Sequence, residues 1–201
     1  MSLARWASAA ACAALLATLP ACDKLFAPAK SPFGGIDVTG TEMGGTLALE
    51  DAAGRPRTLA HWRGKLVVVS FGFTHCPDVC PTTLADLAKA VRQLGGDAER
   101  VQVVFVTVDP KRDTGEVLGQ YVPNFHPSFV GLRGDAAATE RATKAFHVYA
   151  KERPGSSPEA YTVDHSSQTF VLDREGRLRL IFPYGMKPEA MASDLKVLLN
   201  S

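Results

Sequence analysis

Two runs of apolar residues, rich in β-branched side chains, constrain the fold of this chain more than any other feature. They cover residues 66–73 and 101–108, and neither run contains a charged residue. Strands that are buried on both faces have this composition, because helices cover both sides of a parallel sheet. Between the two runs, apolar residues recur at helical spacing from Pro81 to Leu94. A strand, a helix and a second strand in this order predict a parallel pair at the centre of an α/β sheet.

The remaining segments predict hairpins and helices around this unit. Turn residues at 51–54 and at 173–176 separate short apolar stretches, so we expect one hairpin before the first run and another near the C-terminus. A short strand is expected over residues 129–132. Three further helices are predicted by apolar spacing, over residues 114–121, 136–146 and 187–199. The alternation of strands and helices, followed by a hairpin, predicts an α/β sandwich.

The first part of the chain has the pattern of a bacterial export signal. Arg5 supplies a positive charge, and the stretch from Trp6 to Leu19 is apolar and uncharged. This length suits the hydrophobic region of a signal peptide better than a membrane-spanning helix. The stretch ends in Leu19-Pro20-Ala21-Cys22, which resembles a lipobox, the motif whose cysteine is lipidated and becomes the mature N-terminus. An uncleaved or conventionally cleaved signal is the alternative.

The predicted domain boundaries follow from this pattern. We expect a signal peptide over residues 1–21, a Gly-, Pro- and Ala-rich tether over 22–45 and one folded domain over 46–201. Asp23, directly after the predicted lipidated cysteine, resembles a signal for retention in the inner membrane. We therefore expect a chain held by lipid on the periplasmic face of the bacterial inner membrane.

The charge balance limits the class of partner. The sequence has 22 basic and 21 acidic residues, and removal of the signal takes away one basic residue, Arg5, which leaves 21 of each. A chain without net charge lacks the broad positive surface that nucleic-acid binding needs. We therefore expect no nucleic-acid partner.

The cysteines define the candidate site. Of four cysteines, Cys12 leaves with the signal and Cys22 is the predicted lipidation site, which leaves Cys76 and Cys80. A single close pair in an exported protein forms a stable disulfide, cycles between thiol and disulfide, or binds a metal. The pair follows the first apolar run, where ligands gather at the carboxyl ends of strands. A permanent disulfide is the less favoured alternative, because so short a loop gains little from closure.

The segment over residues 71–84 reads FGFTHCPDVCPTTL and is similar to the signature of the SCO/SenC family of copper proteins. The similarity continues over residues 106–113, 129–134 and 161–166, and it covers about residues 33–200. The resemblance implies a thioredoxin-like sandwich with a central mixed sheet, an N-terminal hairpin, and a C-terminal hairpin followed by a helix.

The same resemblance implies one copper ion, as Cu(I) or Cu(II), bound by Cys76, Cys80 and His165. We expect His165 just before a strand that begins near Gln168. Thioredoxin-like proteins usually carry a cis-proline there, facing the redox motif. This chain has no proline at that place, which favours metal binding over general disulfide exchange.

Other polar residues near these ligands have two open interpretations each. His75 is the rival ligand, but its place beside Cys76 is expected to point it away. Asp78 is either a turn or helix-cap residue or an outer-shell carboxylate near copper. Asp164 either orients His165 or ends its loop. Asp109 is expected in a turn, or close to the cysteine loop, and residues 149–161 are expected to form a mobile loop.

We therefore expect a membrane-tethered copper chaperone. The resemblance implies that its client is the copper A centre in subunit II of cytochrome c oxidase, with a periplasmic copper donor or thiol reductant as a second partner. The alternative is an enzyme, a thiol-disulfide oxidoreductase in which Cys76 and Cys80 form the redox pair and reduce the cysteines of the oxidase. A peroxiredoxin-like peroxidase is disfavoured, because no distant resolving cysteine remains. A redox or copper sensor is a further alternative.

Overall fold

The computed structural model describes residues 31–157 and 160–201. The predicted signal peptide, Cys12 and Cys22 lie outside the described residues. Within these ranges, no helix is both long enough and apolar enough to cross a membrane.

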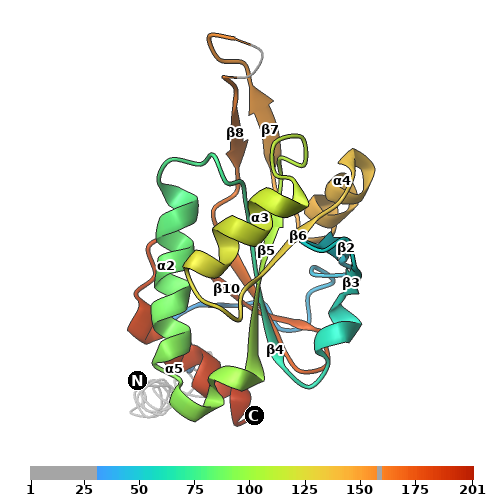
Figure 1. Ribbon diagram of the computed structural model, residues 1–201. Coiled ribbons are helices and arrows are strands. Elements are labelled where there is room, and N and C mark those ends of the chain that lie inside the picture. The colour runs from blue at the N-terminus through green and yellow to red at the C-terminus, as the bar shows by residue number, and fades with distance from the viewer. Residues whose placement is uncertain (1–30, 158–159) are drawn as a thin grey trace, which may run out of the picture. The chain divides into compact units, whose positions relative to one another are not determined.

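Eight strands form one mixed sheet (Figure 1). They are β1 (Ile36–Asp37), β2 (Ala48–Asp51), β3 (Pro56–Thr58), β4 (Leu66–Gly72), β5 (Val101–Thr107), β6 (Val130–Arg133), β9 (Thr169–Leu172) and β10 (Leu178–Phe182). Their order across the sheet is β1-β10-β9-β4-β5-β6-β2-β3. Strands β4, β5 and β6 run parallel, and their neighbours on both sides are antiparallel. The predicted central mixed sheet and both predicted hairpins are confirmed.

The two apolar runs form the centre of this sheet. Every residue of β4 and of β5 is buried. Leu66 and Val68 of β4 face one apolar cluster, whereas Val67 and Val69 face a second one. Successive side chains of a strand point to opposite faces, so the sheet has an apolar core on each side.

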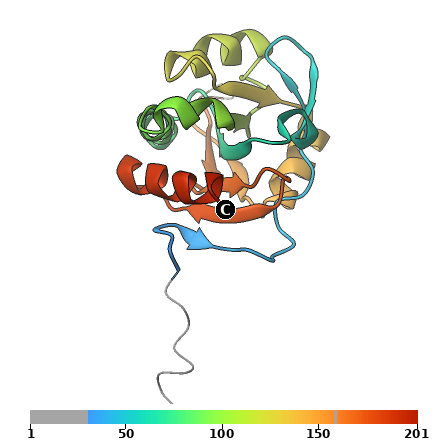
Figure 2. The same cartoon turned by 90° about the horizontal axis from the view of Figure 1, so that it is seen from below.

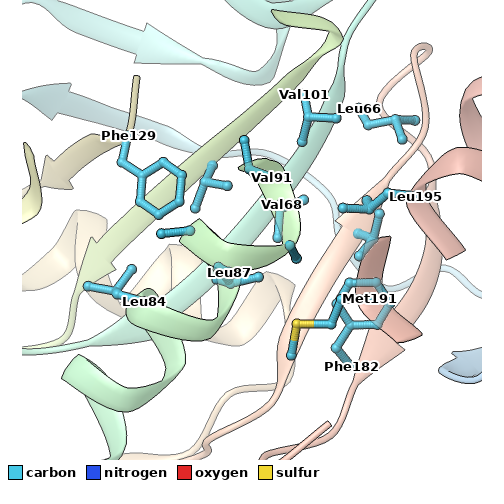
Figure 3. Close-up of a cluster of buried hydrophobic side chains, with 14 of the residues drawn as sticks. Leu66, Val68, Leu84, Leu87, Val91, Val101, Phe129, Phe182, Met191 and Leu195 are labelled. Atoms are coloured by element: carbon cyan, nitrogen blue, oxygen red, sulfur yellow. The ribbon is translucent and has the colours of Figure 1, made fainter. Parts of the chain in front are cut away.

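Helices cover both faces of the sheet. They are α2 (Val79–Arg92), α3 (Gly115–Tyr121), α4 (Ala136–Ala145) and α5 (Pro188–Leu199), with short 3-10 turns η2 (Leu59–Trp62), η3 (Gly95–Arg100) and η4 (Val122–Asn124). Leucines and valines of α2 pack with α5 and the face of the sheet that carries Leu66 and Val68 (Figure 3). Helix α4 packs against the opposite face through Ala142. The predicted α/β sandwich is confirmed.

The N-terminal segment joins the domain earlier than the sequence predicts. The backbone amides of Gly34 and Gly35 donate hydrogen bonds to the two carboxylate oxygens of Asp194, a buried residue of α5, at 2.9 and 2.8 Å. Strand β1 then pairs with β10 at the edge of the sheet (Figure 2). The folded unit therefore starts at Pro32 and overlaps the tether expected over residues 22–45. Besides these bonds from backbone donors, Phe33 and Val38 pack against the two core clusters, but such isolated apolar residues form no strand or helix pattern.

A second, two-stranded sheet corrects part of the expectation of a mobile loop over residues 149–161, because residues 150–153 form a strand. Strand β7 (Ala150–Arg153) pairs with β8 (Thr162–His165) in an antiparallel ribbon that extends beyond the main sheet (Figure 1). All four residues of β7 are exposed, so the strand lacks the alternation of apolar and polar residues that identifies a half-buried strand. His165 is thus the last residue of a strand and not a residue of the loop before one.

Candidate metal centre

The two cysteines lie where β4 passes into α2. Cys76 lies in a turn, where its amide donates to the carbonyl of Phe73 at 3.2 Å. Cys80 occupies the first turn of α2, and its amide donates to the sulfur of Cys76 at 3.4 Å. A Cβ atom on Gly72 would lie 2.6 Å from the Cys80 sulfur, so the sulfur packs directly against the strand because this residue is glycine.

The two thiols differ in accessibility. Both are free cysteines, but Cys80 is buried and Cys76 is only half-buried. Burial is the main cause that raises the pKa of the Cys80 thiol well above its usual range. The metal-free site therefore holds Cys80 as a neutral thiol, and a metal that binds as a thiolate complex must displace its proton.

His165 faces the cysteines from the end of β8. Its Nε2 lies 3.4 Å from the Cys80 sulfur, and its Nδ1 lies 2.8 Å from the carbonyl oxygen of Ser166. A carbonyl oxygen only accepts hydrogen bonds, which assigns a proton to Nδ1. In the neutral imidazole, Nε2 then directs its lone pair at the cysteine pair, as a ligand nitrogen must.

Three potential ligand atoms converge at this point. The sulfurs of Cys76 and Cys80 and a ring nitrogen of His165 all lie within 4.8 Å of one another, and this is the metal-binding cluster found among the described residues. Two sulfurs and one imidazole nitrogen form a soft donor set, which suits Cu(I) and also zinc; Cu(II) accepts the same set in a tetragonal site. Carboxylate-preferring ions such as magnesium or calcium do not fit it.

The other candidate ligands lie outside this cluster. The half-exposed His75 has its Nδ1 3.2 Å from the Thr74 hydroxyl and 4.0 Å from a carboxylate oxygen of Asp113. Asp78 precedes the first residue of α2, and its carboxylate accepts a hydrogen bond from the Thr82 hydroxyl at 3.3 Å. The structure therefore places Asp78 in the local turn at the start of the helix.

Asp164 does not orient the imidazole of His165. Its carboxylate pairs with Arg153 across the ribbon at 2.6 Å, and both side chains are about half exposed. The carbonyl of Ser166 makes the hydrogen bond to His165 instead. A backbone group can do this in any sequence, so the pattern of side chains does not reveal it.

Asp113 is a buried residue beside the cysteine loop that the sequence pattern did not single out. Its fully buried carboxylate accepts hydrogen bonds from the hydroxyls of Thr74 and Thr107 at 2.6 and 2.5 Å, and from the Thr74 amide at 3.1 Å. It therefore ties the cysteine loop to the end of β5. Asp109, expected in a turn or near this loop, accepts hydrogen bonds from Tyr161 and Arg112 instead. Both aspartates follow the second apolar run, and only the three-dimensional arrangement distinguishes them.

Comparison with known proteins identifies the relatives of this chain. Residues 37–200 match the SCO1/SenC family. The human mitochondrial protein SCO2 homolog is 42% identical over 134 residues, which cover 66% of this chain and 50% of that protein. The chain thus spans about half the length of the first curated relatives it matches.

Two solved structures are similar over most of the folded part. Bradyrhizobium japonicum ScoI, solved with copper bound, has a TM-score of 0.73 and 39% identity, and the match covers 78% of this chain and 99% of that one. Yeast Sco1, also solved with copper bound, has a TM-score of 0.74 and 32% identity, over 80% of this chain and 90% of that one.

Proposed function

Because the chain belongs to the SCO1/SenC family, we propose that it binds one copper ion through Cys76, Cys80 and His165 and delivers it to the copper A centre in subunit II of cytochrome c oxidase. The observation that carries this proposal is the convergence of two thiols and an imidazole nitrogen within 4.8 Å. The bound copper in the ScoI and Sco1 structures supports the choice of metal.

The residues present fit copper by their chemistry. Thiolates select Cu(I), and the imidazole nitrogen adds a ligand that Cu(II) prefers. The carbonyl of Ser166 holds the proton of His165 on Nδ1, so that Nε2 carries no proton and can bind a metal. Hydrogen bonds from outer-shell groups commonly fix histidine ligands in this way. Bound copper would be the cargo, held by these three side chains until a client replaces them.

The accessibility of the ligands supports transfer to a partner. Cys76 and His165 are both partly exposed, whereas Cys80 is buried at the bottom of the site. A client ligand can therefore approach from the solvent side and replace Cys76 or His165 first. A periplasmic protein that donates copper would use the same side.

One observation favours a second function, thiol-disulfide exchange with the oxidase. The half-buried thiol of Cys76 lies close to the buried Cys80, whose backbone amide is 3.4 Å from the Cys76 sulfur. In this alternative, the Cys76 thiolate attacks a client disulfide, and Cys80 then attacks the mixed disulfide. The client leaves as a dithiol, Cys76 and Cys80 form a disulfide, and a periplasmic thiol reductant restores them.

His165→Ala separates the two functions. The variant removes one metal ligand and leaves both sulfurs, so copper affinity should fall while thiol-disulfide exchange survives. Delivery predicts that cells with the variant assemble oxidase poorly at low copper and recover when copper is added. Full assembly at low copper, together with lost copper binding by the purified variant, would favour the reductase. Variants of either cysteine cannot make this distinction, because both functions need both thiols.

For location, we propose lipid attachment at Cys22 on the periplasmic face of the inner membrane. The support is the sequence pattern that ends in Cys22, which lies outside the described residues. Mass spectrometry of the mature N-terminus tests the proposal: an acylated Cys22 is expected, and Cys22→Ala should abolish it. A free amine at another residue without acyl mass would contradict it.

A further inference from the structure

The strand that carries His165 is not part of the main sheet. Strand β8 pairs with β7 alone among the described strands, and the ribbon extends beyond the eight-stranded sheet (Figure 1). The cysteines, by contrast, lie where β4 passes into α2, with Cys76 in the turn between them and Cys80 in the first turn of α2. His165 itself pairs only with Ala150 of β7, and the chain rejoins the main sheet at Thr169 of β9, which pairs with Ser70 of β4. The other end of β8 has no pairing with the main sheet, so other contacts must hold it near the cysteines.

Three residues attach the start of β8 to the segment after β5, and we call them the Asp109–Arg112–Tyr161 clamp. The Tyr161 hydroxyl donates to the Asp109 carboxylate at 2.7 Å. Arg112 donates through Nε to the other oxygen of Asp109 at 2.5 Å and through Nη1 to the Tyr161 carbonyl at 2.8 Å. The Asp109 side chain is almost fully buried, so these charge-assisted bonds are shielded from water.

The clamp continues into a column of rings that ends at His165. The guanidinium carbon of Arg112 lies 3.6 Å from the centre of the Tyr161 ring and 5.7 Å from that of Phe73. The buried Phe73 ring then meets the His165 imidazole edge to face, at 5.8 Å and 86°. Tyr161 thus restrains β8 at its start, and Phe73 restrains the imidazole at its end.

One atom of Arg112 has no role in the hydrogen bonds of the clamp. Its Nη2 is buried and has no hydrogen-bond partner. Leaving such a donor unpaired costs free energy. The salt bridge to Asp109 uses Nε, so it does not explain why Nη2 is buried without a partner. The stacking of the planar guanidinium against aromatic rings accounts for this orientation, because the ring faces attract the positive charge.

We propose that Arg112 and Tyr161 are positioning residues that hold His165 within ligand distance of Cys76 and Cys80. This inference rests on the proposed copper function. Loss of the clamp leaves the two sulfurs in place at the junction of β4 and α2, but it releases the strand that carries the nitrogen. A protein without the clamp binds copper mainly through sulfur.

Arg112→Lys tests the proposal, because lysine keeps the positive charge but lacks the planar guanidinium, which donates the two hydrogen bonds and stacks on the rings. Loaded with Cu(II), the variant should keep the thiolate-to-copper absorption band but show weaker nitrogen hyperfine coupling. Its Cu(II) affinity should fall by about tenfold, the lower end of the losses for outer-shell changes at metal sites. Arg153→Gln is the matched control, since it breaks an exposed ion pair of the same ribbon and leaves the clamp intact.

A double-mutant cycle separates positioning from general destabilisation. In a His165→Ala background, Arg112→Lys should change Cu(II) affinity by less than about twofold, because no imidazole remains to be positioned. Equal losses of affinity in both backgrounds would overturn the proposal. Unchanged hyperfine coupling in folded Arg112→Lys would also overturn it. If Arg112→Lys does not fold, Tyr161→Phe replaces it in the same cycle, since it removes one hydrogen bond and keeps the ring.

A metal-free measurement distinguishes failure of this inference from failure of the copper function. In the reduced protein, NMR shifts of the His165 ring protons report the nearby Phe73 ring. Arg112→Lys should move these shifts, whereas Arg153→Gln should leave them unchanged. If the wild-type protein binds no copper, the proposed function fails and these shifts still decide the positioning role. Shifts that stay unchanged in Arg112→Lys would overturn the inference.

Discussion

Gly72 and Cys80 are in contact across the junction of β4 and α2, with no room for a side chain between them. A Cβ atom on Gly72 would lie 2.6 Å from the Cys80 sulfur and 2.8 Å from the Phe105 ring. Both neighbours are buried, so neither has free space to move into. The strand therefore determines the depth at which the sulfur lies.

Gly72→Ala should displace the Cys80 sulfur and weaken the site. Overpacking a core costs about 1–3 kcal/mol of folding free energy, and copper affinity should fall with it. Chemical denaturation and a chelator competition measure the two effects. Gly96→Ala is the control, because a Cβ atom there would meet no other atom within 4 Å, and its stability and affinity should hardly change. Wild-type copper affinity in Gly72→Ala would show that Gly72 does not determine the position of the Cys80 sulfur.

Asp113→Asn should loosen the cysteine loop. The amide nitrogen of asparagine cannot accept the hydrogen bonds that the threonine hydroxyls donate to the carboxylate. We expect a loss of about 1–3 kcal/mol in folding free energy and a fall of about tenfold in copper affinity. Glu116→Gln, an exposed change nearby on α3, is the control. Equal stability and affinity in both variants would show that Asp113 does not hold the loop.

Tyr121→Phe should leave the stability unchanged or increase it. The Tyr121 hydroxyl is buried and has no hydrogen-bond partner, and burial is the main cause that raises its pKa well above the usual range. Removing an unpaired buried hydroxyl relieves a cost of about 1–3 kcal/mol. Tyr161→Phe makes the same chemical change but deletes the hydrogen bond to Asp109, so it should destabilise. Thermal unfolding compares the two, and a clear loss for Tyr121→Phe would refute the prediction.

Asp51 should contribute to stability in a pH-dependent way. Burial disfavours its ionised form, but hydrogen bonds from Arg57 and from the chain at Arg55 and Ala53 outweigh burial and lower the pKa of Asp51 to about 2. The unfolded value is about 3.9, so the contribution is complete above that pH and is lost as the pH falls through about 2.

Asp51→Asn should therefore cost about 1–3 kcal/mol at neutral pH, and its stability should approach that of the wild type as the pH falls from about 4 towards 2. Urea unfolding at several pH values measures the difference. Asp86→Asn, which breaks an exposed pair with Lys89, should change stability little at any pH. A difference between Asp51→Asn and wild type that is constant over this range would contradict the assignment.

The sequence predicted those parts of the fold that depend on side-chain pattern. Strands β4 and β5 were identifiable because they are buried on both faces, and α2 because one face is apolar. Strand β7 was not, because its four residues are all exposed. The segment at Gly34 and Gly35 joins the domain through backbone donors to the Asp194 carboxylate and through the isolated apolar residue Phe33, which form no periodic pattern.

The candidate site was only partly predictable for a similar reason. The cysteines are four residues apart, and their spacing at a strand end indicates a site. His165 is one of five histidines and lies far away in sequence, so it was identified by family resemblance and not by pattern. Asp113 and Arg112 act through hydrogen bonds and ring contacts between distant segments, which no local pattern reports.

X-ray absorption at the copper edge of the reduced, copper-loaded protein identifies the atoms that bind the metal. We expect one copper per chain with two sulfur neighbours and one nitrogen neighbour, since two thiols and one imidazole converge at the site. His165→Ala should remove the nitrogen contribution and keep both sulfurs. A wild-type spectrum with fewer than two sulfur neighbours, or with a nitrogen contribution that persists in His165→Ala, would contradict the assigned ligands.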